Sequence, residues 1–267
     1  MRLRILQLLV LICLAVGAAG YLRTQTSPLS GEGVQGLLPS LPAGKITFRV
    51  GTLNMHSGVG EDDVYNLNRT IDAVRGTDLC ALNEVRGRAF GEPANQAEEL
   101  AHATGVAWLY LPSERRFWHD DFGNALLTRL PIDQWIRTPL PAEPRHGGYR
   151  NVTIATTRFG SQDVEVVITH IDRETDQSNQ IRFVTRLFSS LRQPAMLLGD
   201  LNANSDNPDI QTLLAIPGIH DCLGEATGQK RGRIDWILCR GLKTAGGGLI
   251  KNGASDHPMY WADLQLP

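Results

Sequence analysis

The sequence predicts an α/β fold in which layers of sheet are covered on the outside by helices. Two observations support this prediction. Strand-like and helix-like segments alternate from Lys45 onward, and several of the strand-like segments are almost continuously apolar. A strand that is apolar on both faces has to be covered on both sides, which requires stacked layers. No clear boundary or repeat divides this region, so residues 45–267 are predicted to form a single domain.

The first half of the domain contains strand-like runs that are either apolar or alternating. The predicted strands are residues 45–55, 77–85, 106–112 and 124–132. A helix is predicted over residues 65–76, because apolar side chains recur there at spacings of three and four before Gly76. A second helix is predicted over residues 95–105, closed by Gly105.

The second half continues the same alternation. The predicted strands are residues 149–159, 164–171, 194–202, 232–241 and 257–266. Residues 178–192 carry one apolar face and predict an amphipathic helix. Residues 208–216 predict a short helix with Pro208 in its first turn.

The first 44 residues differ from the domain. In residues 1–20 the cationic MRLR precedes the apolar ILQLLVLICLAVGAAG, which is typical of a signal peptide or a retained N-terminal membrane anchor. Residues 21–44 are rich in Ser, Gly and Pro and predict a flexible linker. The protein is therefore expected to be exported (periplasmic or secreted) or anchored to the membrane by an uncleaved N-terminal segment.

Composition and cysteine content restrict the class only loosely. The chain is 42% hydrophobic and 20% charged with a net charge of -2, which fits a globular protein and neither demands nor excludes a polyanionic partner. No zinc-ligand spacing is present. Cys80 is predicted to be buried in its apolar run, and pairing of Cys222 with Cys239 stays open.

Polar residues capable of chemistry repeatedly occur at or near the ends of the predicted strands, with Asp235 within a strand and Asp256 and His257 just before the last strand. They are Asn54, Glu84, His170, Asp200, Asn202, Asp235, Asp256 and His257. Taken singly, each is explained by a turn, an ion pair or a core hydrogen bond. As a set, their carboxylates and carboxamides suit a hard cation such as Mg²⁺, and the histidines beside acids suit proton transfer and charge stabilisation.

The stretch LLGDLNANSDNPD, residues 197–209, has an alternative interpretation as a calcium-binding loop. Polar residues recur at every second position from Asp200, as they do in a helix–loop–helix calcium site. That interpretation fails because Ser205 stands where Gly is needed and Gln211 where Glu is needed. Asp200 and Asn202 are therefore predicted to end a strand.

Seven motifs carry a resemblance to a known family. They are GTLNMHSG, LCALNEV, GNALLTRLPI, VVITHID, MLLGDLNA, GRIDWIL and SDHPMYWADL. In order and spacing they resemble the endonuclease/exonuclease/phosphatase superfamily, with its deoxyribonuclease I-like fold. The pairing of GDLN with a later SDH is specific. The resemblance implies a four-layer α-β-β-α sandwich with a metal-dependent phosphoesterase site at one end.

The resemblance implies metal ligands and catalytic groups at matching positions. Glu84, Asn54 and Asp256 match the metal-binding residues, with Mg²⁺ expected and Mn²⁺ or Ca²⁺ as alternatives.

The remaining motif positions match groups that act on water and phosphate. Asp200 matches the residue that orients or deprotonates the attacking water, and Asn202 matches an amide that binds phosphate or holds that aspartate. His257 matches the histidine that faces the scissile phosphate, and Asp235 the acid that fixes its tautomer. His170 matches a histidine that contacts a non-bridging oxygen or assists the leaving group.

Three further positions have weaker matches. Arg150 lies where many members place a basic or aromatic phosphate contact. Asn124 fits a family strand but has a structural alternative, and Asn83 replaces the usual Gln before the metal-binding Glu. The loop before Asp235 is shortened.

The resemblance implies hydrolysis of phosphodiester bonds, with a secreted or membrane-tethered nuclease or phosphodiesterase expected. Basic clusters at residues 113–118, 144–150 and 228–233 could hold a nucleic-acid backbone, or could be scattered surface charge. The alternative is a lipid or inositol headgroup phosphoesterase at a membrane. A binding module without activity is disfavoured because the catalytic set is complete. A monomer is expected.

Overall fold

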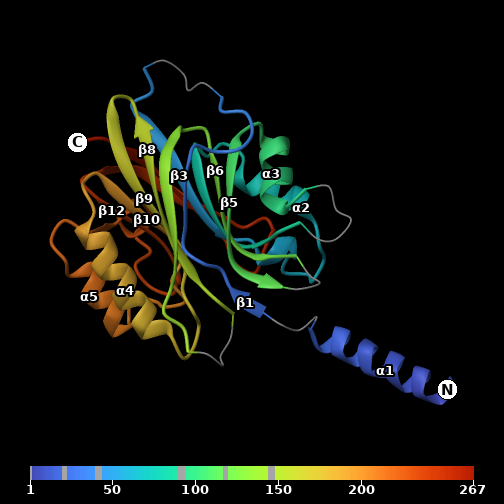
Figure 1. Cartoon of the computed structure of the whole chain (residues 1–267). Helices are drawn as coiled ribbons and strands as arrows, with labels where there is room; N and C mark the ends of the chain where they lie inside the picture. Colours follow the sequence, from blue (N-terminus) through green and yellow to red (C-terminus); the bar gives the residue numbers. More distant parts are fainter. Residues whose placement is uncertain (1, 20–22, 40–43, 89–93, 117–119, 144–147) are drawn as a thin grey trace.

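The computed structural model describes residues 2–19, 23–39, 44–88, 94–116, 120–143 and 148–267, and its side chains from Arg4 to Gly17 and from Arg23 onward within these ranges. Two seven-stranded sheets pack face to face, and helices cover their outer faces (Figure 1). The predicted four-layer sandwich is confirmed.

The first sheet has the strand order β1-β5-β6-β4-β3-β14-β13. Its strands are β1 (Arg23–Gln25), β3 (Thr47–Asn54), β4 (Leu79–Arg86), β5 (Ala107–Arg116), β6 (Phe122–Thr128), β13 (Lys243–Ile250) and β14 (Met259–Gln265). Its outer face packs on α2 (Leu67–Val74) and α3 (Gln96–Thr104). A 3-10 turn, η1 (His56–Gly58), follows β3.

The second sheet has the strand order β11-β12-β10-β9-β8-β7-β2. Its strands are β2 (Leu29–Glu32), β7 (Ile132–Pro139), β8 (Asn151–Phe159), β9 (Gln162–His170), β10 (Ala195–Asp200), β11 (His220–Asp221) and β12 (Asp235–Arg240). Helices α4 (Gln177–Ser190) and α5 (Pro208–Leu214) cover its outer face, and α6 (Cys222–Thr227) packs near β12 and β13.

Three apolar clusters hold the four layers together. The central cluster lies between the sheets and includes Phe48 and Phe159, whose ring centroids are 4.6 Å apart. A second cluster joins the first sheet to α2 and α3, and a third joins the second sheet to α4 and α5. Strands covered on both faces are apolar at nearly every position, which explains why the sequence predicts them well.

The predicted helices begin and end at recognisable caps. The side chains of Asn66, Asn95 and Asn207 accept backbone N–H groups at the starts of α2, α3 and α5. Gly105 closes α3 in the left-handed conformation, and Pro208 occupies the first turn of α5 as the sequence predicts.

Two predictions about strands were incomplete. The run 124–132 was predicted as one strand, but β6 ends at Thr128 in the first sheet and β7 begins at Ile132 in the second. Pro131 lies at this crossing, where its missing N–H donor does no harm. Strand β13 was missed because glycines weaken strand patterns, yet a side chain at Gly248 would press against the Trp261 ring.

Residues 21–44 were predicted to be a flexible linker, but two short strands form inside this segment. Strand β1 pairs with the end of β5, and β2 pairs with β7. Both are outer strands held by backbone hydrogen bonds, which need no apolar pattern in the side chains.

The N-terminal helix α1 (Arg2–Ala19) extends away from the sandwich (Figure 1). Its large apolar side chains are exposed, for example Leu11 at 63% and Leu14 at 64%. Among the helices of the described residues, none is long and apolar enough to cross a membrane.

The cysteines take different environments. Cys222 in α6 and Cys239 in β12 form a disulfide, with their Cα atoms 6.5 Å apart. Cys80 is fully buried as predicted, and burial raises the pKa of its thiol to about 12. Cys80 is therefore a packing residue.

Gly199 is required by the close approach of β10 to β9. Its φ is +142°, and an added Cβ would overlap the carbonyl oxygen of Thr169. Gly199→Ala is therefore expected to lower the free energy of unfolding by about 3 kcal/mol or more. Gly160→Ala is the matched control, because Gly160 also has a positive φ but open space around its Cα. Urea unfolding checks the prediction, and an equal loss in both variants would contradict it.

Candidate active site

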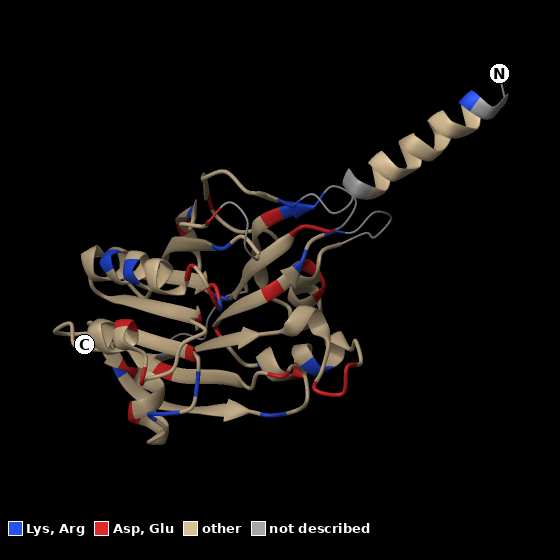
Figure 2. Ribbon diagram, turned by 90° about the horizontal axis from the view of Figure 1, so that it is seen from below, with Lys and Arg blue, Asp and Glu red and all other residues tan. Residues whose placement is uncertain are grey.

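The polar strand ends meet at one end of the sandwich. In the first sheet, β3 and β4 are parallel and pair Asn54 with Asn83. In the second sheet, β9 and β10 are parallel and pair His170 with Asp200. Figure 2 views the molecule from below relative to Figure 1, and residues of both charge signs lie near the centre of that view.

These strand ends surround a cavity of about 290 Å³. Its lining residues are Asn54, His56, Glu84, Arg150, His170, Arg173, Asp200, Asn202, Asp256 and His257. Every residue predicted for the site therefore lines the cavity except Asp235, which lies behind His257 and contacts it. The structure thus gathers residues as far apart in the sequence as Asn54 and His257.

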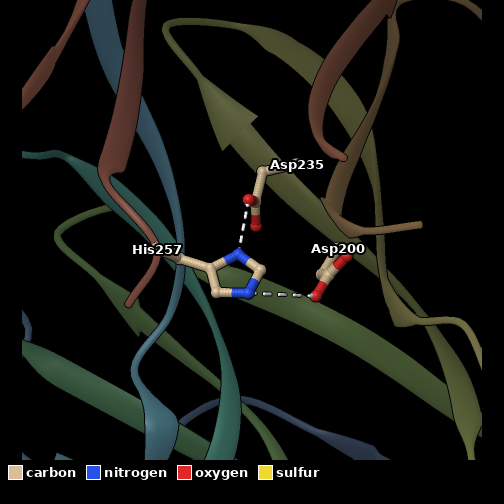
Figure 3. Close-up of side chains that lie close together, drawn as sticks. All are labelled: Asp200, Asp235 and His257. Carbon is tan, nitrogen blue, oxygen red and sulfur yellow. Dashed lines mark hydrogen bonds and ion pairs between the residues drawn. The ribbon is translucent and has the colours of Figure 1, made fainter. Parts of the chain in front are cut away.

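His257 bridges two buried acids (Figure 3). Its Nδ1 lies 2.8 Å from Asp235 Oδ2, and its Nε2 lies 3.9 Å from Asp200 Oδ2. Asp235 begins β12, whereas His257 lies in the loop before β14, so the pair joins the two sheets. With Nδ1 hydrogen-bonded to Asp235, the ring presents Nε2 to the cavity.

The charge state of His257 follows from its neighbours. Partial burial opposes protonation, but the hydrogen bond to Asp235 and the charges of Asp235, Asp200 and Asp256 outweigh it and raise the pKa to about 9. His257 is therefore a cation at neutral pH, suited to stabilising negative charge or donating a proton.

Asp200 is an acid with an unusually high proton affinity. Burial and the neighbouring Asp235 raise its pKa to about 7, although His257 acts in the opposite direction. The side chain accepts hydrogen bonds from the Asn202 backbone at 2.7 Å and from Asn54 Nδ2 at 3.1 Å. A carboxyl group that titrates near neutrality is suited to accept a proton from water.

His170 lies on the other side of Asp200 and differs from His257. Its Nε2 is 3.6 Å from Asp200 Oδ2 and 3.2 Å from Asn202 Nδ2. Burial, and secondarily the charges of Arg150 and His257, hold the pKa of His170 well below its usual value. His170 is therefore neutral at neutral pH and acts through hydrogen bonds.

Glu84, Asn54 and Asp256 offer oxygen atoms on the first-sheet side of the cavity. Glu84 has a φ of +58° beside a bulge in β4, which turns its side chain out of the ladder. Asn54 donates to Glu84 at 3.1 Å, and its Oδ1 accepts the His56 backbone N–H. Asp256 is 59% exposed, with His56 Nδ1 3.8 Å away. An all-oxygen set of this kind fits a hard divalent ion.

A second group could also hold a cation. Ligand atoms of Asp200, Asp235 and His257 lie within 4.8 Å of one another. However, His257 already hydrogen-bonds Asp235 and is protonated at neutral pH, and a protonated ring nitrogen cannot ligate a metal. The Asp200, Asp235 and His257 group is therefore suited to proton transfer, whereas the oxygen atoms of the Glu84 group are suited to an ion.

Two arginines lie on the second-sheet side of the cavity. Arg150 precedes β8, and its Nε is buried with no hydrogen-bond partner among the described residues. Arg173 follows β9 and is exposed. The cavity is therefore acidic on the Glu84 side and cationic on the opposite side, which suits a phosphoester that binds between a metal ion and arginine side chains.

Sequence reasoning missed three residues near the site and the role of a fourth, Asn83. His56 and Arg173 line the cavity, and only their positions, one or two residues past a predicted strand, could have suggested them. Ser255 is buried and donates to the Asn54 carbonyl at 2.6 Å, which fixes the loop that carries His257. Asn83 accepts the backbone N–H of Asp200 at 2.9 Å.

The two shifted pKa values predict a bell-shaped pH profile for hydrolysis. The rate is expected to rise through about pH 7 as Asp200 ionises and to fall through about pH 9 as His257 loses its proton. Asp235 raises both pKa values, so Asp235→Asn is expected to move both limbs to lower pH. Measurement of kcat/KM from pH 5 to 10 tests this, and unchanged limbs in the variant would contradict it.

The site combines a cationic histidine, fixed by a buried acid, with an all-oxygen ligand set. At the end of an α-β-β-α sandwich, this combination is that of a phosphoesterase. Residues 51–257 match the model of the Endonuclease/Exonuclease/phosphatase family, and the chain belongs to that family. Members of this family are hydrolases that act on phosphate esters, typically with a divalent metal ion.

Solved structures share the fold at low identity. The endonuclease/exonuclease/phosphatase from Beutenbergia cavernae DSM 12333 is 23% identical with a TM-score of 0.68, over 83% of this chain and 72% of that chain. The human Nocturnin catalytic domain with bound sulfate anion is 15% identical with a TM-score of 0.65, over 83% and 94% of the two chains.

A third structure contains nucleic acid. D. rerio TDP2 complexed with single strand DNA product is 17% identical with a TM-score of 0.59, over 83% of this chain and 100% of that chain. A search of curated protein sequences gave no match.

Proposed function

We propose that the protein is a divalent-metal-dependent phosphodiesterase that uses Mg²⁺. The observation that carries the proposal is the hydrogen-bonded His257–Asp235 pair beside Asp200, in the same cavity as Glu84 and Asp256. Together they provide the groups that diester hydrolysis needs: an aligned water, charge neutralisation and a proton donor.

Each side chain has a separate task in this proposal. Asp200 accepts a proton from the attacking water, and Asn202 holds the Asp200 carboxylate through its backbone N–H. Protonated His257 stabilises the charge that develops on phosphate, and Asp235 fixes its orientation. His170 and Arg150 bind non-bridging oxygens from the second-sheet side. When bound by Glu84, Asn54 and Asp256, the metal ion supplies charge neutralisation to the phosphoryl oxygens.

Nucleic acid is the first substrate class to consider, because it contains diesters flanked by further phosphates. Two arginines of the predicted basic clusters are already paired with acids. Arg116 pairs with Glu114, and the buried Arg233 pairs with Asp221. Lys230 and Arg231, from the third cluster, line a different cavity beside α6. The cluster residues 117–118 and 144–147 lie outside the described residues. TDP2, one of the structural neighbours, is complexed with single strand DNA product, which supports this class.

The fold also supports the second class, phosphoesters in lipid headgroups. Strand β1 starts at Arg23, which pairs with Arg116 at the end of β5. Strand β6 links this end of β5 to the end of β4, because its Phe122 pairs with Glu114 on one side and Arg86 on the other. Helix α1 ends at Ala19, four residues earlier, so its end lies within about 14 Å of Arg23. If the protein is exported and α1 is retained at a membrane, this connection keeps the catalytic cavity near the headgroups.

A substrate panel tests the proposal. The purified protein is assayed on bis-nitrophenyl phosphate with EDTA and after addition of Mg²⁺, and we expect activity only with the metal. Plasmid DNA, RNA, sphingomyelin vesicles and phosphoinositide vesicles then distinguish the two substrate classes. Failure to hydrolyse any of these substrates with Mg²⁺, Mn²⁺ or Ca²⁺ would overturn the proposed function.

The assignment of Glu84 to the ion has its own test. Glu84→Gln is expected to raise the Mg²⁺ concentration for half-maximal activity by at least about tenfold, because it removes a charged oxygen ligand. Glu165→Gln is the control, since Glu165 is a half-buried carboxylate on β9 away from the catalytic end. Titration of activity with Mg²⁺ gives the measurement, and equal midpoints in both variants would remove Glu84 from the ion site.

A further inference from the structure

Three buried asparagine side chains form a continuous hydrogen-bonded chain between the two sheets, directly behind the catalytic cavity. Asn83 lies on β4, Asn124 on β6 and Asn151 on β8, and all three are at most 2% exposed. Asn83 Nδ2 donates to Asn124 Oδ1 at 2.8 Å, and Asn124 Nδ2 donates to Asn151 Oδ1 at 3.0 Å. Asn151 Nδ2 in turn donates to the Leu111 carbonyl on β5 at 3.0 Å.

Asn83 is the member of this chain that reaches the catalytic strands. Its Oδ1 accepts the backbone N–H of Asp200 at 2.9 Å, and its Nδ2 also donates to the Thr169 carbonyl at 3.1 Å. Both amide hydrogens and one oxygen lone pair are therefore used, in a place with no access to solvent. One side chain of the first sheet thus holds β9 and β10 of the second sheet.

The partners of the chain adjoin the catalytic residues in sequence. Asn83 precedes Glu84, Thr169 precedes His170, and Asn151 follows Arg150. Thr169 Oγ1 also donates to the Asn151 carbonyl at 3.0 Å, which links β8 to β9 at the same level. A shift of any one partner therefore moves a residue of the cavity.

The hydrophobic attraction between the sheets is non-directional and does not by itself select one alignment. A fully satisfied buried network is directional and costly to break, so it selects one arrangement. The metal-binding acid Glu84 and the general base Asp200 lie on different sheets, and their separation depends on how the sheets are aligned.

We propose that Asn83 is a positioning residue that sets the alignment of Glu84 with Asp200 across the two sheets. This inference rests on the proposed phosphodiesterase function. Asn83 does not line the catalytic cavity, whereas its neighbour Glu84 does. Asn83 acts through the backbone of Asp200 and through β9.

The test compares Asn83→Leu and Asn83→Asp with Thr128→Val, a control that also removes a buried side-chain hydrogen bond. Thr128→Val removes a buried hydroxyl that donates to Leu130 at the other end of β6, far from the cavity. All three variants are expected to lose thermal stability. At saturating Mg²⁺, Asn83→Leu is expected to lower kcat by about 10- to 100-fold with a smaller change in KM, and Thr128→Val to keep the wild-type kcat. Asn83→Asp is expected to lie between these values, because it keeps the acceptor for the Asp200 N–H but loses both hydrogen bonds that the Asn83 amide donates.

A folded Asn83→Leu variant with wild-type kcat overturns the inference. If that variant does not fold, Asn83→Asp decides, and a wild-type kcat there overturns the inference on its own. A cross-hydrogen-bond coupling between the Asp200 amide nitrogen and the Asn83 side-chain carbonyl, measured by NMR in the wild type, is expected and needs no substrate. An inactive wild type would count against the proposed function, whereas an active wild type with equally active Asn83 variants counts against the positioning role.

Discussion

Replacement of His257 by alanine is expected to abolish measurable diester hydrolysis, a loss of about 10²- to 10⁴-fold or more. The change removes the cationic ring that Asp235 orients toward the cavity, and it leaves the charge on the phosphate uncompensated from that side. Rates on bis-nitrophenyl phosphate at saturating Mg²⁺ measure the effect. Thermal unfolding is expected to show an intact fold, because His257 lies in a loop and is only partly buried.

The control for this experiment is His102→Ala. His102 lies in the last turn of α3, exposed and outside the catalytic cavity, so its loss is expected to leave the rate unchanged. Normal turnover by His257→Ala would remove the histidine from the mechanism. Equal losses in both variants would show that the rate reports a general structural effect.

Asp200→Asn is expected to produce an equally large loss of activity, about 10²- to 10⁴-fold, because an amide cannot accept the proton of water. Asn has the same shape as Asp, so the side chain still accepts the Asn202 backbone N–H. Asp200→Ala is expected to be inactive as well, with an added loss of packing at this buried position. The rate is measured on the same diester as for His257.

Asp200→Asn is expected to lower activity without lowering the stability of the fold. The pKa of Asp200 is raised to about 7 in the folded protein, so the folded state binds a proton that the unfolded state releases between about pH 4 and pH 7. The free energy of unfolding therefore falls through this window and stays lower above it. At pH 8 the Asn variant is expected to be at least as stable as the wild type in urea unfolding. Asp206→Asn is the control, because Asp206 is exposed, and it is expected to change neither the rate of hydrolysis nor the free energy of unfolding. A clearly less stable Asn variant at pH 8 would contradict this account.

These two predictions connect the shifted pKa values to the chemistry. An acid that resists ionisation is a cost to the fold, and it is retained where a base is needed near neutral pH. Asp235 raises the pKa of both Asp200 and His257, so one fully buried carboxylate is expected to set both limits of the active pH range.

The prediction of the fold from sequence succeeded where the pattern is local. Doubly covered strands such as β4 and β10 are apolar throughout, and amphipathic α4 shows its spacing directly. Prediction failed where pairing depends on the backbone or on distant neighbours. Strands β1 and β2 are outer strands with ordinary polar sequences, and β13 is glycine-rich because Trp261 of the adjacent strand lies across it.

The candidate site divides in the same way. Sequence alone determined the chemical types and the strand-end positions of the residues from Asn54 to His257, because a strand ends where its apolar run ends. Arg173 and His56 carry no such pattern, since one lies in a loop after β9 and the other in the η1 turn after β3, and the direction of each is decided by the strand it follows. The inter-sheet role of Asn83 was also hidden, because its partners come from three other strands.

Only the tertiary structure decided how the two site histidines differ. In the sequence, His170 and His257 are both histidines next to an Asp-containing motif. In the fold, His170 is buried near Arg150 and its pKa falls, whereas His257 faces three acids and its pKa rises to about 9. Proton affinity is set by burial and by the charges within a few ångströms, and those neighbours come from segments that only folding brings together.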